Sequence, residues 1–112
     1  MPLADLSAEE LAVVRECLKC IAEGSAIPHD WEFQTLFGIE PSDVQAVLSE
    51  WPQVDDSEQR VYLAINNSMN SLLGLISDRE LARYIPYSKG EIGDAFRKWK
   101  GSISDGYFDE IQ

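Results

Sequence analysis

Apolar side chains recur every three to four residues in four segments of this 112-residue chain, which is the spacing of one face of an α-helix. The first segment begins at Ser7, which together with Glu10 has the spacing of a capping box. Gly24 suits the left-handed position that closes a helix. The predicted core-facing residues of this helix are Leu11, Val14, Leu18, Ile21 and Ala22.

Proline, serine and glycine mark the limits of three further helices. Proline is tolerated at Pro41 because a first-turn residue needs no N–H, and Pro52 cannot continue a helix. Ser88 and Glu91 repeat the capping-box spacing. The expected limits are Pro41 to Pro52, Ser57 to Gly74 and Ser88 to Gly101. The predicted core-facing residues are Val44, Val47, Leu48 and Trp51, then Val61, Ile65, Ser68, Met69 and Leu72, then Ile92, Ala95, Phe96 and Trp99.

Two shorter helices are predicted between the long ones. The first runs from Trp31 to Phe37 with Asp30 as its N-cap, and the second runs from Ser77 to Tyr84. No segment alternates between apolar and polar residues in the manner of a strand. We therefore predict an all-α fold, a compact bundle of five to six helices in a single domain over residues 1–112, ending in a short acidic tail at 101–112.

Two segments of the chain resemble each other in the spacing of their residues. DVQAVLSEW at 43–51 matches EIGDAFRKW at 91–99 in the spacing of its apolar residues and its tryptophan. Each copy ends a series of long helix, short helix and capped helix, with an offset near fifty residues. Because a solenoid normally needs at least three repeats, this match indicates a pseudo-duplicated helix unit within one bundle.

Charge narrows the range of partners. The formal net charge is −11, and residues 1–59 carry 13 acidic residues against only Arg15 and Lys19. Nucleic acids and anionic membranes are polyanions, so this balance disfavours both as direct ligands. No apolar run is long enough to span a bilayer, and the N-terminus has no secretory signal. We expect a soluble cytoplasmic protein.

No catalytic motif withstands inspection. Cys17 and Cys20 form a C-x-x-C, but they fall in the middle of a helix, away from the N-terminal field that activates a thiol. His29-Asp30 resembles the doublet of metal-dependent phosphohydrolases, yet His29 is the only histidine. There is no phosphate-binding loop and no nucleophile elbow. The sequence predicts no enzyme, no cofactor and no metal.

Two segments leave alternatives open. Asparagine disfavours a helix, yet Asn66, Asn67 and Asn70 fall within one predicted helix. In one interpretation these amides are solvated or satisfied within the fold. In the other, Leu63, Asn67 and Asn70 form a recognition patch. Residues 79–100 resemble a helix-turn-helix in outline, and a DNA-binding regulator is the alternative function. A mixed-charge surface is favoured there, because acids dilute the basic residues Arg79, Arg83, Lys89, Arg97, Lys98 and Lys100.

The acidic residues of 30–58 are the main functional candidates: Asp30, Glu32, Glu40, Asp43, Glu50, Asp55, Asp56 and Glu58. Some suit helix caps and first turns. These local roles do not explain why almost no basic residue compensates the negative charge. A surface that carries charge of a single sign attracts an oppositely charged partner during approach. Trp31 would supply an aromatic anchor. Charge reversal at Asp55 with Asp56, or at Glu40 with Asp43, is expected to slow binding.

The stretch WEFQTLFGIEPSDVQAVLSEWP, followed by AINNSMNSLLG, resembles a group of small, uncharacterised bacterial helical proteins. This resemblance covers Trp31 to Gly74 and implies a bacterial origin and a helical fold, but no activity. By size and acidity the chain also resembles toxin-immunity proteins. The most concrete hypothesis is an immunity protein that neutralises a basic nuclease toxin by blocking its active site, with a basic protein as partner.

Overall fold

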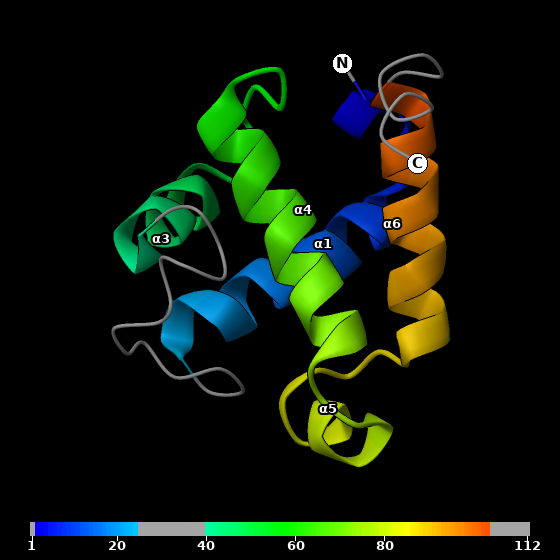
Figure 1. The fold of residues 1–112 in the computed structure, drawn as a ribbon. Coiled ribbons are helices and arrows are strands. Elements are labelled where there is room, and N and C mark those ends of the chain that lie inside the picture. The colour runs from blue at the N-terminus through cyan, green and yellow to red at the C-terminus, as the bar shows by residue number, and fades with distance from the viewer. Residues whose placement is uncertain (1, 25–39, 104–112) are drawn as a thin grey trace.

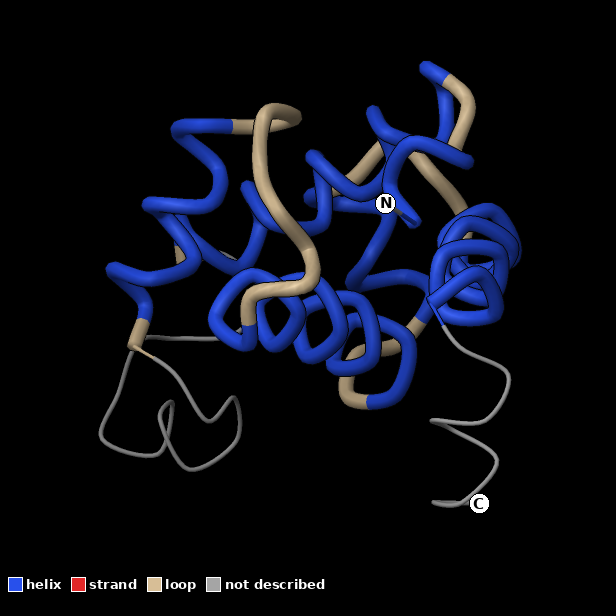
Figure 2. The backbone as a smooth tube through the Cα atoms, turned by 90° about the horizontal axis from the view of Figure 1, so that it is seen from above, coloured by secondary structure: helices blue, strands red, loops and turns tan. Residues whose placement is uncertain are grey.

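The chain folds into helices that pack around α1. The computed structural model describes residues 2–24 and 40–103, and no strand occurs among them (Figure 2). The elements are the 3-10 turn η1 (Pro2–Asp5) and the helices α1 (Ala8–Glu23), α3 (Pro41–Glu50), α4 (Gln59–Gly74), α5 (Asp78–Tyr84) and α6 (Lys89–Ile103). The all-α prediction is confirmed. The predicted helix from Trp31 to Phe37 lies outside the described residues.

Two pairs of helices share one core. α1 packs against α4, and both α3 and α6 pack against each of these two helices. Figure 1 shows α1 passing behind α4, with α3 on one side and α6 on the other. The helices that carry the two matching sequence segments, α3 and α6, thus occupy corresponding places. The predicted duplication also includes the short helix at 31–37, which lies outside the described residues, so the duplication stays a prediction.

The helix ends follow the local sequence signals closely. The Ser7 hydroxyl accepts a hydrogen bond from the Glu10 N–H, and the Glu10 carboxylate accepts one from the Ser7 N–H. Ser88 and Glu91 make the same reciprocal pair at the start of α6. Gly24 has a φ of 70°, which a residue without Cβ adopts at no steric cost. Three limits differ from the prediction: α3 ends at Glu50, α4 begins at Gln59, and α6 continues two residues beyond Gly101.

The predicted apolar faces form the core. The largest fully buried side chains are Trp99, Leu18, Ile21, Ile65, Met69, Leu72, Leu81, Ile92, Val14 and Val44. Leu48, Trp51 and Phe96 are partly buried and pack at the edge of this core. Burial of a side chain of this size stabilises a fold by roughly 1.5–3 kcal/mol. The helical periodicity therefore identified the side chains that hold the bundle together.

Asp56 is a buried anchor, which corrects its predicted place on the acidic surface. The residue is only 3% exposed. Its Oδ2 accepts hydrogen bonds from the Leu3 N–H at 3.2 Å and from the Trp99 Nε1–H at 2.9 Å. A buried indole N–H needs an acceptor. Asp56 therefore joins η1 and α6 to the loop between α3 and α4, and it is not available to a partner.

Glu10 links the start of α1 to α6 and should make stability depend on pH. Its pKa lies below the ordinary value of 4.5, first because of the Ser7 N–H and next because of Lys98, whose Nζ lies 2.9 Å away. Since the folded-state pKa is the lower one, the stabilisation is complete above about pH 4.5 and is lost as the pH falls through the folded-state pKa.

We expect Glu10→Gln to lower Tm at pH 7, because the amide neither pairs with Lys98 nor carries the charge that favours a helix N-terminus. The difference from the wild-type Tm should shrink as the pH is lowered below about 4.5. Thermal unfolding followed by circular dichroism between pH 7 and pH 3 measures this. A Tm difference that stays constant over that range would show that ionisation of Glu10 contributes nothing.

Candidate functional site

The predicted acidic residues fall into two groups at opposite ends of α3. Glu40 and Asp43 lie at its start, whereas Glu50, Asp55 and Glu58 lie at its end and in the loop that leads to α4. A helix of this length places its ends about 15 Å apart. The predicted residues Asp30, Trp31 and Glu32 lie outside the described residues.

The carboxylates differ in whether they already accept hydrogen bonds within the protein. Asp43 accepts a hydrogen bond from the Glu40 N–H at 3.1 Å. Asp55 accepts one from the Ser57 hydroxyl and one from the Ser57 N–H, and these bonds lower the pKa of Asp55. Glu50 and Glu58 are exposed, and neither side chain bonds another group within residues 2–24 and 40–103. Glu50 and Glu58 are thus the carboxylates most open to a partner.

A hollow of about 440 Å³ lies between η1 and the loop that follows α3, and we call it the η1 groove. It is lined by Leu3, Ala4, Leu11, Pro52, Gln53, Val54 and Asp55. Its lining among the described residues is therefore mainly apolar, and its one ionisable side chain is a carboxylate.

Two tight turns bring more negative charge to this groove. The Gln53 N–H donates to the Glu50 carbonyl at 2.8 Å, and the Glu58 N–H donates to the Asp55 carbonyl at 3.1 Å. Asp5, which is exposed, follows Ala4 at the end of η1. We use the name acidic end for the η1 groove together with Asp5, Glu50, Asp55 and Glu58.

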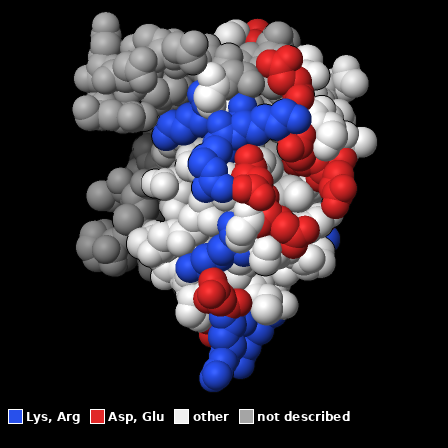
Figure 3. All heavy atoms as spheres, turned by 90° about the vertical axis from the view of Figure 1, so that its right-hand side faces the viewer, with Lys and Arg blue, Asp and Glu red and all other residues white. Residues whose placement is uncertain are grey.

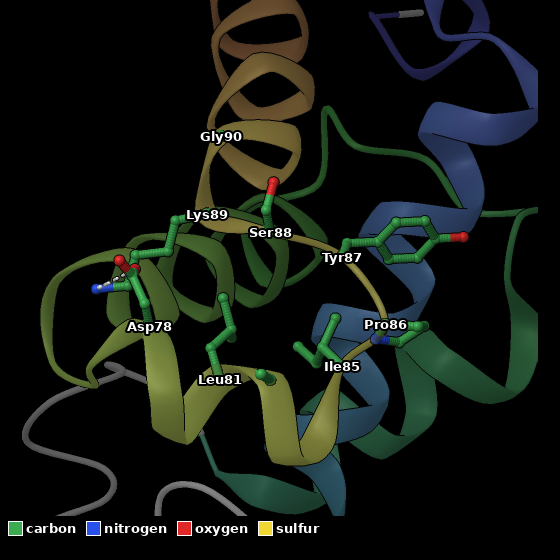
Figure 4. A pocket seen from close by; sticks show the side chains of 9 residues that line it. Asp78, Leu81, Ile85, Pro86, Tyr87, Ser88, Lys89 and Gly90 are labelled. Carbon is green, nitrogen blue, oxygen red and sulfur yellow. Dashed lines mark ion pairs between the residues drawn. The ribbon is translucent and has the colours of Figure 1, made fainter.

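A second hollow, the α5 pocket, has a volume of about 550 Å³ and lies between α5 and the start of α6 (Figure 4). Leu81, Ile85 and Tyr87 contribute apolar surface to it. Its two charged side chains pair with each other, since Lys89 Nζ lies 3.9 Å from Asp78 Oδ1. The described lining residues include neither a cysteine nor a histidine. The pocket suits apolar contact better than acid–base or nucleophilic catalysis.

The helix-turn-helix candidate, residues 79–100, carries six basic and three acidic residues, and several of its cations pair with carboxylates. Figure 3 shows basic and acidic side chains beside one another over the face on which α6 and α5 lie. The ion pairs are Arg83 with Glu80, Lys89 with Asp78, Arg97 with Asp94 and Lys98 with Glu10. Lys100 lies over the Phe96 ring at 5.1 Å. Because carboxylates already accompany these cations, the segment favours the mixed-charge interpretation over phosphate binding.

The asparagines of α4 are only partly accessible. Asn66 donates from Nδ2 to the Asn67 Oδ1 at 2.8 Å, and both residues are half-buried, as is Leu63. Only Asn70 of the proposed recognition patch is exposed. This hydrogen bond engages the Asn66 amide nitrogen, but the Asn66 Oδ1 is buried and accepts no hydrogen bond from a described residue.

The two cysteines are buried thiols that form no disulfide. Burial is the main cause that raises the pKa of Cys17, which opposes formation of the thiolate that reacts or binds metal. Within residues 2–24 and 40–103, no three His, Cys, Asp or Glu side chains gather as metal ligands. Over the same residues, no helix is both long enough and apolar enough to cross a bilayer.

Sequence reasoning missed η1 as a wall of the site. Four residues are too few to show a helical period, and Leu3 is fixed by Asp56, which lies 53 positions away in the chain. No protein-family model, curated protein or solved structure matches the chain.

Proposed function

We propose that this protein is a non-enzymatic binding protein that presents its acidic end to a basic protein. One observation carries the proposal: an apolar groove is bordered by exposed carboxylates, and no basic side chain lines it among the described residues. The cations of α5 and α6, in contrast, are mostly paired with carboxylates. At the acidic end a basic surface would meet exposed carboxylates that border an apolar groove and pair with no cation among the described residues.

The net charge of −11 supports rapid capture of such a partner, because long-range attraction raises the rate of encounter. The most concrete form of the proposal is an immunity protein from a bacterial toxin system. It would occupy the nucleic-acid site of a basic nuclease toxin, with Glu50, Asp55 and Glu58 in the places of phosphates. This role needs surface complementarity and no catalytic group.

The experiment is affinity capture with three baits from lysate of the organism that encodes the protein. The baits are the wild-type chain, a Glu50→Lys/Glu58→Lys variant, and a Glu23→Lys/Asp94→Lys control that changes the net charge equally at other exposed positions. We expect the wild-type and control baits to retain the same basic protein at low salt and the acidic-end variant to lose it.

Equal retention by all three baits would refute the acidic end as the binding surface. Retention of nucleic acid in place of protein would support the alternative, a DNA-binding regulator. In that case neutralising Arg97 and Lys98, which lie on α6, should abolish the retention.

A further inference from the structure

We infer that the η1 groove is an anchoring pocket for one apolar side chain of a basic peptide segment in the partner, with lysine or arginine on either side of that side chain. This inference rests on the proposed function and specifies the chemistry of the partner's contact segment. It assigns the groove a role separate from that of the surrounding charges: the carboxylates attract the segment and the apolar walls hold it.

The size and lining of the groove fit such a side chain. Its volume of about 440 Å³ falls within the roughly 300–1,000 Å³ of typical ligand pockets. Leu3 and Val54 are 5% and 8% exposed, so they form a nearly buried floor, and Leu11 is partly buried beside them. An apolar side chain placed here would leave water and meet apolar neighbours.

The charge around the groove specifies the flanking residues. Asp55 lies in the lining, while Asp5, Glu50 and Glu58 are exposed on the turns that form its borders. Successive residues of an extended peptide are about 3.3–3.6 Å apart, so basic residues one or two positions from the anchor would stay near these carboxylates. An anchor without neighbouring cations would bring uncharged or negative groups against them.

Other occupants match this charge poorly. The chain's own residues 104–112 contain three carboxylates and no lysine or arginine. A second copy of the chain would bring another net charge of −11. Electrostatic complementarity therefore selects a basic segment of a different protein.

The groove is held in shape by contacts within the protein. Asp56 accepts a hydrogen bond from the Leu3 N–H, and the Leu6 N–H donates to the Leu3 carbonyl at 3.2 Å. The first bond fixes η1 against the loop between α3 and α4, and the second closes the turn of η1 itself. A preformed groove loses little conformational freedom on binding, which favours affinity for a short segment.

The test uses three synthetic peptides and amide NMR spectra of the full chain at low salt. The peptides are Lys-Lys-Leu-Lys-Lys, the same sequence with glycine in place of leucine, and Glu-Glu-Leu-Glu-Glu. We expect the leucine peptide to shift the amides of Leu3, Ala4 and residues 53–55 in a saturable way. The glycine peptide should bind about tenfold more weakly, and the acidic peptide should not bind.

Two matched variants separate the groove from the charge around it. Ala4→Phe should obstruct the groove with a phenyl ring and weaken binding of the leucine peptide about tenfold, without removing a carboxylate. Ala82→Phe adds the same bulk at an exposed position of the α5 pocket and should leave binding unchanged. Dispersed amide spectra of both variants would show that they remain folded, and the comparison of peptides on the wild-type chain does not depend on either.

Equal affinity for the leucine and glycine peptides would overturn the anchor, as would unchanged binding to folded Ala4→Phe or shifts confined to residues 81–90. Those results would leave electrostatic capture of a basic protein standing. Equal retention by the charge-reversed bait would instead refute the acidic end as the surface that binds a basic protein. The two failures can therefore be told apart.

Discussion

Replacing Trp99 by alanine is expected to lower the free energy of unfolding by about 3–5 kcal/mol. The Trp99 side chain is fully buried, and its ring lies 5.4 Å from the ring of Tyr62 and 6.3 Å from that of Phe96, measured between centroids. Alanine would leave a cavity at this contact and remove the indole N–H that bonds Asp56. Urea denaturation followed by circular dichroism at pH 7 measures the loss.

Trp99→Phe separates the hydrogen bond from the packing. It keeps an aromatic ring but removes the Nε1–H, so Asp56 loses one of its two donors, at an expected cost of about 1–3 kcal/mol. Trp51→Phe is the control at the matching position of the first sequence segment, directly after α3, because Trp51 is only half-buried and its indole bonds no group among the described residues. Its loss should be smaller.

A double-mutant cycle of Trp99→Phe with Asp56→Ala should give a coupling of at least about 0.5 kcal/mol. Coupling near zero, or equal losses in Trp99→Phe and Trp51→Phe, would contradict the anchoring role of Asp56.

Reversing the charge at Glu50 and Glu58 should slow association with the captured basic protein by about tenfold or more at low ionic strength. Both side chains are exposed, so the substitutions should change the free energy of unfolding by no more than about 0.5 kcal/mol. The substitutions should change the association rate more than the dissociation rate, because exposed charges attract the partner as the two proteins approach each other. Stopped-flow fluorescence over a range of salt concentrations measures it.

The Glu23→Lys/Asp94→Lys variant is the control, because it brings the net charge from −11 to the same −7. It should slow association less, since these residues lie on α1 and α6 outside the acidic end. The rates of the three chains should converge as salt screens the charges. An equal reduction by the two variants would mean that total charge, and not the acidic end, controls capture.

Asp56 and Asp43 are less suitable than Glu50 and Glu58 for charge reversal, because their carboxylates accept hydrogen bonds that hold the fold. Asp56 is buried and accepts hydrogen bonds from Leu3 and Trp99, so Asp56→Lys would leave both donors without their acceptor and place a cation beside them, which would destabilise the fold. Asp43 bonds the first turn of α3 through the Glu40 N–H. Loss of binding in either variant would therefore not distinguish a lost contact from a lost fold.

The fold was largely predictable because its signals are local. The Ser7–Glu10 and Ser88–Glu91 boxes each lie within four consecutive residues, and Pro41 acts through its own ring. The apolar periods identified the core because each helix buries one face in this bundle. These features require no knowledge of which helix contacts which.

The candidate site was less predictable because it depends on contacts between distant segments. Asp56 stands beside Asp55 in an acidic loop, and only the Leu3 N–H and the Trp99 indole, 43 positions further along, show that it is buried. One signal was present: Trp99 occupies a core position of its helix, and a buried indole needs an acceptor. Which of the many acids would serve could not be read from spacing.

Hydrogen–deuterium exchange of the full chain, alone and with the basic protein that it captures, locates the binding surface directly. If the acidic end is the binding surface, amides of residues 3–5 and 50–58 should gain protection in the complex, and those of 81–90 should not. Protection that is confined to α5 and α6, with none at η1 or at the loop after α3, would contradict the account.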